Sequence, residues 1–208
     1  MINVSIAGIG GQGSVLAAKI LAQAAQAKGW QVRTAETIGM AQRGGNVISH
    51  VRMGNLGEAV YAPLPAQASV DVVIALEPGE GVRALNLLKP EGLLVIPSTG
   101  IAPTVVDFKA PIYNPDRMIY ELKEKGVNLV VVNDEAICSQ LMSRKPLNVV
   151  MLAYALLAVE RKSSCATNAL HGNLGLAEMR EAIPVCVKEQ FVSMNMKALN
   201  IVEKMYRS

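Results

Sequence analysis

A short apolar strand that runs into a glycine-rich turn and then an alanine-rich helix constrains this chain more than any other feature. The strand is Ile2–Ala7, the turn reads Gly-Ile-Gly-Gly-Gln-Gly, and the helix is predicted over Ser14–Lys28. Gly29 stands where a helix C-cap is expected, and Gln31–Ala35 gives a second strand. This order predicts a βαβ unit with a parallel pair of strands that is buried on both faces.

The glycine turn is also the first candidate binding site. Backbone N–H groups point outward at a helix N-terminus, the helix dipole adds partial positive charge, and a missing Cβ lets a phosphate approach. The spacing alone is weak evidence, because glycines can serve the turn itself. The candidate ligand-binding residues here are Gly8, Gly10, Gly11, Gln12, Gly13 and Ser14.

A second candidate is the turn Arg43-Gly44-Gly45. A guanidinium is a planar fork of donors that suits phosphate, and adjacent glycines can fold into an anion-holding nest. Alternatively, Arg43 pairs with a carboxylate across a subunit contact. The sequence leaves both interpretations open.

A dinucleotide-binding enzyme is the standard interpretation of such a glycine turn. It requires an acidic residue about 20 positions later, and Glu36 is close to that spacing. However, a glycine-rich stretch follows Glu36 instead of a second strand–helix unit. Asn46–Met53 partly alternates in polarity, Gly54–Gly57 is a turn, and Glu58–Tyr61 can return as a partner strand, which predicts an antiparallel hairpin. A stand-alone NAD(P)-binding dehydrogenase is therefore kept only as an alternative.

The rest of the pattern completes one domain over residues 1–208. Strands are predicted at Val70–Leu76, Leu93–Ile96 and Val127–Val132, and helices at Glu80–Leu88 and Pro115–Lys125. After Asn133 the chain is expected to be helical. The predicted fold class is α/β, a three-layer Rossmann-like domain with a mixed, mainly parallel sheet, an antiparallel hairpin and a helical C-terminal third.

Two C-terminal helices carry different apolar patterns. Leu147–Glu160 is apolar on nearly every side, which predicts burial all round. Self-association of the isolated chain through this helix, giving a homodimer, is left open. The last helix, after Pro184, has an apolar stripe that is expected to pack on the core along its length. The stripe consists of Val187, Phe191, Met194, Ala198, Ile201 and Met205.

Composition argues against several functions. Lys and Arg number 20 against 17 Asp and Glu, the basic residues are scattered, and there are only two Phe and one Trp, which disfavours nucleic-acid binding. The longest apolar run, Val149–Val159, is shorter than the ~20 residues needed to cross a bilayer. Cys138, Cys165 and Cys186 lack C-x-x-C spacing, so we expect no metal or iron–sulfur cluster and a reducing, cytoplasmic location.

A family likeness lies in two motifs. Residues 8–13 read Gly-Ile-Gly-Gly-Gln-Gly, and residues 36–54 read Glu-Thr-Ile-Gly-Met-Ala-Gln-Arg-Gly-Gly-Asn-Val-Ile-Ser-His-Val-Arg-Met-Gly. Together they resemble the gamma subunit or domain of pyruvate and other 2-oxoacid:ferredoxin oxidoreductases. The stretch Lys145–Asn148 and the closing helix also fit, so the resemblance covers essentially the whole chain. The second motif is most similar to the beta subunit of indolepyruvate ferredoxin oxidoreductases.

The resemblance implies a division of labour between subunits. The family couples oxidative decarboxylation of a 2-oxoacid to acylation of coenzyme A and reduction of ferredoxin. Thiamine diphosphate and the iron–sulfur clusters would belong to a large alpha-type partner subunit, which would deliver electrons to ferredoxin. This chain would then carry no complete active site. It would help to bind coenzyme A through Gly10–Gly13 and Arg43–Gly45 and would complete the complex. A ligand-free assembly subunit is the other alternative.

Three polar residues of the matched strand, Ser49, His50 and Arg52, are left without an assigned role. His50 is interpreted either as a hydrogen-bonded structural histidine or as a group lining a subunit interface or the acyl-acceptor channel. His171, the other histidine, is read as a loop residue.

Overall fold

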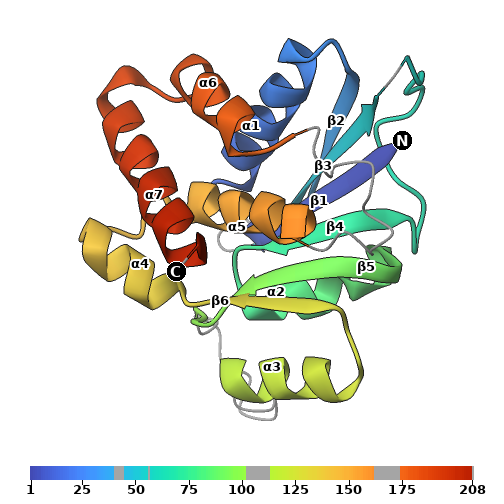
Figure 1. The fold of residues 1–208 in the computed structure, drawn as a ribbon. Coiled ribbons are helices and arrows are strands. Elements are labelled where there is room, and N and C mark those ends of the chain that lie inside the picture. The colour runs from blue at the N-terminus through green and yellow to red at the C-terminus, as the bar shows by residue number, and fades with distance from the viewer. Residues whose placement is uncertain (40–44, 56, 102–112, 162–173, 208) are drawn as a thin grey trace.

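The computed structural model describes residues 1–39, 45–55, 57–101, 113–161 and 174–207 (Figure 1). These residues form a six-stranded sheet in the order β2-β3-β1-β4-β5-β6, with helices on both faces. The strands are β1 (Ile2–Ile9), β2 (Gln31–Ile38), β3 (Asn46–Gly54), β4 (Val70–Ala75), β5 (Leu88–Pro97) and β6 (Leu129–Val132).

The sheet is mixed and mainly parallel, as predicted. β1, β4, β5 and β6 run parallel, whereas β3 is antiparallel to both of its neighbours, β1 and β2. Because parallel strands end at one edge, the segments that follow β1, β4, β5 and β6 gather at their carboxyl ends. That edge is where ligands of open α/β sheets commonly bind.

The helices make up the two outer layers, so the three-layer prediction is confirmed. One face of the sheet shares a large hydrophobic core with α1, α4, α5, α6 and α7, and the other face packs on α2, the 3-10 helix η1 and α3 (Figure 1). The helices are α1 (Ser14–Ala27), α2 (Pro78–Arg83), η1 (Ala84–Leu87), α3 (Pro115–Glu124), α4 (Asp134–Leu141), α5 (Leu147–Arg161), α6 (Leu176–Cys186) and α7 (Glu189–Arg207).

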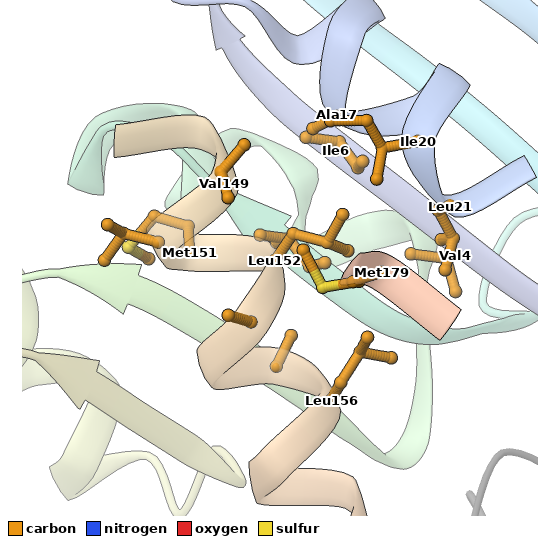
Figure 2. Close-up of a cluster of buried hydrophobic side chains, with 14 of the residues drawn as sticks. Val4, Ile6, Ala17, Ile20, Leu21, Val149, Met151, Leu152, Leu156 and Met179 are labelled. Carbon is orange, nitrogen blue, oxygen red and sulfur yellow. The ribbon is translucent and has the colours of Figure 1, made fainter. Parts of the chain in front are cut away.

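The centre of the larger core is α5, which lies beneath α1 and α6. Figure 2 shows Leu152 of α5 beside Met179 of α6, with Ile6 of β1 and Ile20 of α1 in the same hydrophobic cluster. Every residue of α5 is buried except Tyr154, Glu160 and Arg161. The prediction of a helix buried on all sides is confirmed. The helix is therefore an interior part of the core formed by the described residues.

Two predicted pairings are wrong: Glu58–Tyr61 is not a strand, and β1 and β2 do not form the predicted parallel pair buried on both faces, since β2 is a mostly exposed edge strand. β3 pairs instead with β2, from Gln31↔Gly54 to Ile38↔Val47, and with β1 on its other side. β1 and β2 are parallel in direction but are not neighbours, because β3 lies between them.

Local chemistry explains why the chain after β3 stays irregular. Pro63 and Pro65 have no backbone N–H to give to a ladder. Arg52 also donates to the carbonyl oxygens of Ala62 at 2.8 Å and Leu64 at 3.2 Å, and so binds this segment with a side chain.

Two further boundaries differ from expectation. β5 begins at Leu88, before the predicted start at Leu93, and so includes Lys89–Gly92. Its ladder with β4 shifts register there, as in a β-bulge. The buried residues of α7 are Asn195, Ala198, Leu199 and Val202. Of the predicted stripe, Val187 and Ala198 are buried and the others are half-exposed. The buried face is therefore rotated from the one predicted.

None of the described helices combines the length and the apolar character needed to cross a membrane.

Candidate functional site

The glycine turn leads from β1 directly into α1. Gly11 and Gly13 have positive φ angles of 94° and 85°, which favour glycine. Gly13 is the N-cap of α1 and supplies no side-chain cap, and the first turn of α1 holds no acidic residue. The positive end of the helix dipole is therefore not neutralised by the helix itself.

Free backbone donors line this turn. Gly10 N donates to Gly45 O and Gln12 N to Ile9 O, whereas the N–H groups of Gly11, Gly13 and Ser14 have no acceptor among the described residues. A Cβ added to Gly11 would have no atom within 4 Å, so the turn borders open space there. Outward N–H groups next to open space at a helix N-terminus suit an anion such as a phosphate.

Gly45 of the second predicted motif contacts the glycine turn. Gly10 N lies 3.0 Å from Gly45 O, and a Cβ on Gly10 would stand 3.6 Å from the same oxygen. The structure therefore places Gly45, the last residue of the second motif, beside the glycine turn. Arg43 and Gly44, also predicted to bind phosphate, lie outside the described residues.

Two residues of the predicted set hold the turn in shape. The Gln12 side chain accepts from Ile9 N at 2.7 Å and donates to Leu76 O at 3.2 Å. A Cβ on Gly8 would lie 2.9 Å from Gln12 Oε1, so Gly8 makes room for that side chain. Ser14, the first residue of α1, is buried, and its hydroxyl makes no hydrogen bond with a described residue.

Asn148 is a site residue that pattern analysis missed. Its Nδ2 donates to Gly13 O at 3.0 Å, and a Cβ on Gly13 would lie only 2.7 Å from that nitrogen. The second residue of α5 thus packs against the N-cap of α1. The sequence did mark this region, because the stretch Lys145–Asn148 fits the family resemblance. That resemblance did not predict any contact for Asn148.

A polar cluster beyond β5 and β6 was also missed. Asp134 is fully buried and accepts from Ser98 Oγ at 3.0 Å, from Thr99 N at 3.0 Å and from Arg144 Nη2 at 2.6 Å. Burial opposes ionisation, but the hydrogen bonds from Thr99, Arg144 and Ser98 hold the pKa of Asp134 below its ordinary value. The guanidinium of Arg144 is half-exposed, so this cluster fixes a cation at the carboxyl edge.

Two buried carboxylates follow β4 at the same edge. Glu77 caps α2 by accepting from Glu80 N at 3.1 Å, and Glu80 pairs with Arg83. Glu77 Oε1 and Glu80 Oε2 have no hydrogen-bond partner among the described residues. Burial raises the pKa of Glu77, with the charge of Glu80 adding to the effect. The edge therefore carries both a fixed cation and a carboxyl group that is unusually easy to protonate.

The polar residues of β3 contact other parts of the sheet. His50 is buried, with Nδ1 2.9 Å from Ser5 Oγ and Nε2 3.5 Å from Thr37 Oγ1, and burial lowers its pKa. Arg52 Nε donates to Asn3 Oδ1 at 3.0 Å. These contacts fit structural roles for His50 and Arg52. Ser49 Oγ is buried and unpaired among the described residues.

Two hollows differ in how close they lie to the glycine turn. One of about 790 Å³ lies at the amino ends of β5 and β6, away from the turn. The other, of about 390 Å³, is bordered by α1, the start of α5 and the start of α7, and Asn148 is part of its lining. Since Asn148 also bonds to Gly13, this smaller pocket adjoins the candidate anion site.

Comparison with known proteins identifies the family to which the chain belongs. The sequence matches the family model described as pyruvate ferredoxin/flavodoxin oxidoreductase over residues 3–202. The chain belongs to this family. It is 34% identical over 201 residues to the indolepyruvate oxidoreductase subunit IorB of Archaeoglobus fulgidus, a match that covers 96% of this chain and 92% of that subunit.

Solved structures agree in fold with this member of the pyruvate ferredoxin/flavodoxin oxidoreductase family. The gamma subunit of a keto/oxoacid ferredoxin oxidoreductase from Geobacter sulfurreducens superposes with a TM-score of 0.67 at 20% identity, over 100% of this chain and 99% of that one. A 2-oxoglutarate:ferredoxin oxidoreductase from Magnetococcus marinus, solved with 2-oxoglutarate, coenzyme A and succinyl-CoA, gives 0.67 at 18% identity. That match covers 99% of this chain and 31% of the longer one.

Proposed function

We propose that this chain is the accessory, gamma-type subunit of a 2-oxoacid:ferredoxin oxidoreductase that acts on indolepyruvate or a related aryl pyruvate. The match over 96% of this chain and 92% of a subunit named for indolepyruvate carries the proposal. In the complex the 2-oxoacid loses CO₂, its acyl group passes to coenzyme A, and the released electrons pass to ferredoxin. Thiamine diphosphate and the iron–sulfur clusters are assigned to a large alpha-type subunit.

The proposed role of this chain within the complex is to bind coenzyme A. Coenzyme A is an anion, and the N–H groups of Gly11, Gly13 and Ser14 have no acceptor among the described residues at a helix N-terminus that is open beside Gly11 and has no acidic residue in its first turn. Gly45 lies beside them, and Arg43 is proposed to add a guanidinium from the same connection. Holding a remote nucleotide would orient the reacting thiol toward the partner subunit.

The dehydrogenase alternative is disfavoured by the order of the strands. A dinucleotide site needs the acidic residue after the second strand to reach a ribose beside the first. Here Glu36 lies on the edge strand β2, and β3 separates β2 from β1. Strands are spaced by about 4.8 Å, so Glu36 is displaced by about one strand from the position that such a site requires.

A ligand-free assembly subunit is the remaining alternative. It would explain the glycines by the turn alone, as the contacts of Gly8 and Gly13 illustrate. It gives no reason for the open space beside Gly11 or for the unpaired N–H groups, so a bound ligand is the better explanation.

Co-purification tests the proposal directly. This chain would be co-expressed with the large subunit, and the complex titrated with coenzyme A and assayed for dye reduction on aryl and alkyl 2-oxoacids. We expect a stable complex, preference for aryl pyruvates, and weaker coenzyme A binding after Arg43→Ala. Failure to co-purify, or coenzyme A affinity unchanged by every change in the glycine turn and at Arg43, would contradict it.

A further inference from the structure

Two neighbouring carboxyl groups after β4 are buried with an oxygen of each left unpaired. Glu77 and Glu80 are 2% and 3% exposed, so both are more than nine-tenths buried. Glu77 Oε2 accepts from Glu80 N, and Glu80 Oε1 pairs with Arg83, whereas Glu77 Oε1 and Glu80 Oε2 have no partner among the described residues. A buried carboxylate without a partner is so costly that the group ordinarily takes up a proton instead.

The surroundings of the pair supply too little positive charge to hold two carboxylates. Arg83 contacts Glu80, but its side chain is 63% exposed, so solvent weakens its field. On the other side lies Tyr113: a Cβ on Gly79 would stand 3.0 Å from Glu77 Oε2 and 3.5 Å from the Tyr113 ring. The Tyr113 hydroxyl is buried and also unpaired among the described residues. Two carboxylates and one guanidinium leave one negative charge, which one proton would balance.

A proton fits this place better than a larger ligand does. The unpaired oxygens have almost no surface open to solvent. Beneath α2 the sheet is apolar, since a Cβ on Gly81 would meet the side chains of Ala75, Leu94 and Ile96. The described residues also contain no group of three or more His, Cys, Asp or Glu side chains suited to a metal ion. Burial, with the charge of Glu80 adding to it, raises the pKa of Glu77, which agrees with a proton as the occupant.

The pair is joined to the glycine turn through the residue that precedes Glu77. Leu76 N donates to Ala7 O at 2.8 Å, and Leu76 O accepts from Gln12 Nε2 at 3.2 Å. The turn and the pair therefore lie at the same edge of the sheet, on adjoining strands β1 and β4. Like charges repel strongly where protein replaces water between them. An anion bound at the turn would thus oppose the ionised form of Glu77.

We propose that Glu77 and Glu80 together bind one proton at a pH where exposed glutamates are ionised, and that an anion at the glycine turn tightens the hold on this proton. The coupling rests on the proposed function, because coenzyme A is the anion assigned to the turn. Linkage is reciprocal, so coenzyme A should bind more tightly when the pair is protonated. Its binding should therefore take up part of a proton and weaken as the pH rises.

Infrared spectroscopy of the assembled complex tests the proton site without any ligand. A protonated carboxyl group absorbs apart from an ionised one, so titration in D₂O follows its loss. The difference spectrum between the unmodified complex and Glu77→Gln should show a carboxyl band that persists above the ordinary glutamate pKa. The exposed Glu124→Gln is the matched control and should show none. Glu80→Gln removes the neighbouring like charge and should move the loss of the band to lower pH.

Stability gives a second readout of the same group. Because the folded-state pKa of Glu77 is raised, its contribution to stability is present below the ordinary value of 4.5 and is lost as the pH rises through the folded pKa. Glu77→Gln stays neutral, so the melting temperature of this variant relative to the unmodified complex should rise as the pH is raised. The same comparison for Glu124→Gln should be nearly flat.

Calorimetric titration with coenzyme A tests the coupling. Titrations in buffers of different ionisation enthalpy count the protons taken up on binding. The unmodified complex and Glu124→Gln should take up the same fraction of a proton, and Glu77→Gln clearly less. One linked proton can weaken affinity by up to about tenfold per pH unit, and this slope should be flatter in Glu77→Gln.

The outcomes separate this inference from the proposed function. If coenzyme A binds with the same proton uptake in Glu77→Gln and in the unmodified complex, the inference fails and the proposed function stands. If neither coenzyme A nor inorganic diphosphate binds the unmodified complex, both fail. Should Glu77→Gln not assemble, Glu80→Gln and the unmodified complex decide: carboxyl bands that all vanish at the ordinary glutamate pKa in both would overturn the inference.

Discussion

At the residue scale, the glycines between β1 and α1 meet different surroundings. Gly8 leaves room for Gln12, Gly10 faces the carbonyl of Gly45, and Gly13 abuts Asn148. Only Gly11, of these four, has nothing near the place of a Cβ. The turn is thus packed from within and open at one point, which is what a rigid anion-binding turn requires.

Gly13→Ala should lower the stability of the protein by more than the cost of the positive φ angle alone. An alanine with positive φ costs about 1–2 kcal/mol, and here its Cβ would also meet Asn148 Nδ2 at 2.7 Å. Gly29→Ala is the matched control, since Gly29 has a φ of 77° and no atom within 4 Å of the Cβ position. We expect both variants to lose stability in urea denaturation and only Gly13→Ala to lose coenzyme A affinity. Equal losses of stability in the two variants would show that the Asn148 side chain moves away from the added Cβ at little cost.

Asp134 should make the stability of the protein depend on pH. Its folded-state pKa lies below the ordinary value of 3.8, so its contribution is complete above that pH and is lost as the pH falls through the folded pKa. Asp134→Asn should cost about 2 kcal/mol near neutral pH, because it removes the charged acceptor of buried hydrogen bonds from Ser98 and Thr99 and of the bond from the half-exposed Arg144. The deficit should shrink in acid. Denaturation curves at several pH values measure it, with the exposed Glu124→Gln as control; a deficit independent of pH would assign the loss to packing.

Much of the glycine turn could be predicted from sequence, because its signals are local. A glycine spacing between a strand and a helix specifies where backbone amides emerge. The contacts of Asn148 and Asp134 could not be predicted this way. Asn148 reaches Gly13 across 135 positions, and Asp134 meets Thr99 across 35, and no periodic pattern marks either one.

At the element scale, the apolar patterns predicted most strands and helices, and the errors have physical causes. Alternation in Asn46–Met53 correctly indicated a strand with two different faces, since Val51 belongs to one core and Ile48 packs on the other. Its partner was misassigned, because alternation says nothing about which edge of a strand is occupied. The buried face of α7 was predicted in the wrong orientation. The prediction followed apolar residues alone, and the buried face includes a polar residue, Asn195.

The burial of α5 predicts a large cost for truncating it. Leu152 is fully buried between α1 and the sheet, so Leu152→Ala should lower the free energy of unfolding by about 2–5 kcal/mol. Leu64, which is 53% exposed, provides the same substitution without a cavity and should change it little. Urea denaturation of the two variants checks this. Similar small effects would mean that the helix relaxes into the space left behind.

At the scale of the whole molecule, the strand order governs which ligands fit. β3 lies where a dinucleotide fold places its second parallel strand, beside β1. The carboxyl edge is instead completed by the helical C-terminal third, through Asn148 and Arg144. The domain keeps the glycine turn and helix N-terminus of such folds but does not place a parallel second strand beside β1.

This topology predicts that the chain does not use nicotinamide cofactors. Fluorescence titration with NADH or NADPH should show no saturable binding at concentrations where coenzyme A saturates the complex. Glu36→Ala should leave the coenzyme A affinity unchanged, because β2 lies at the sheet edge with β3 between it and β1. Tight NADH binding that Glu36→Ala abolishes would instead favour the dehydrogenase alternative.

The bond between Asn148 and Gly13 has a consequence for how such chains are cut or fused. A fragment that ends near Val132 keeps the whole glycine signature and all six strands, yet it lacks the asparagine that seats the turn. Truncated or circularly permuted versions should therefore be judged by whether α5 is retained. In evolution, too, the motif and the C-terminal helices would have to be inherited as one unit.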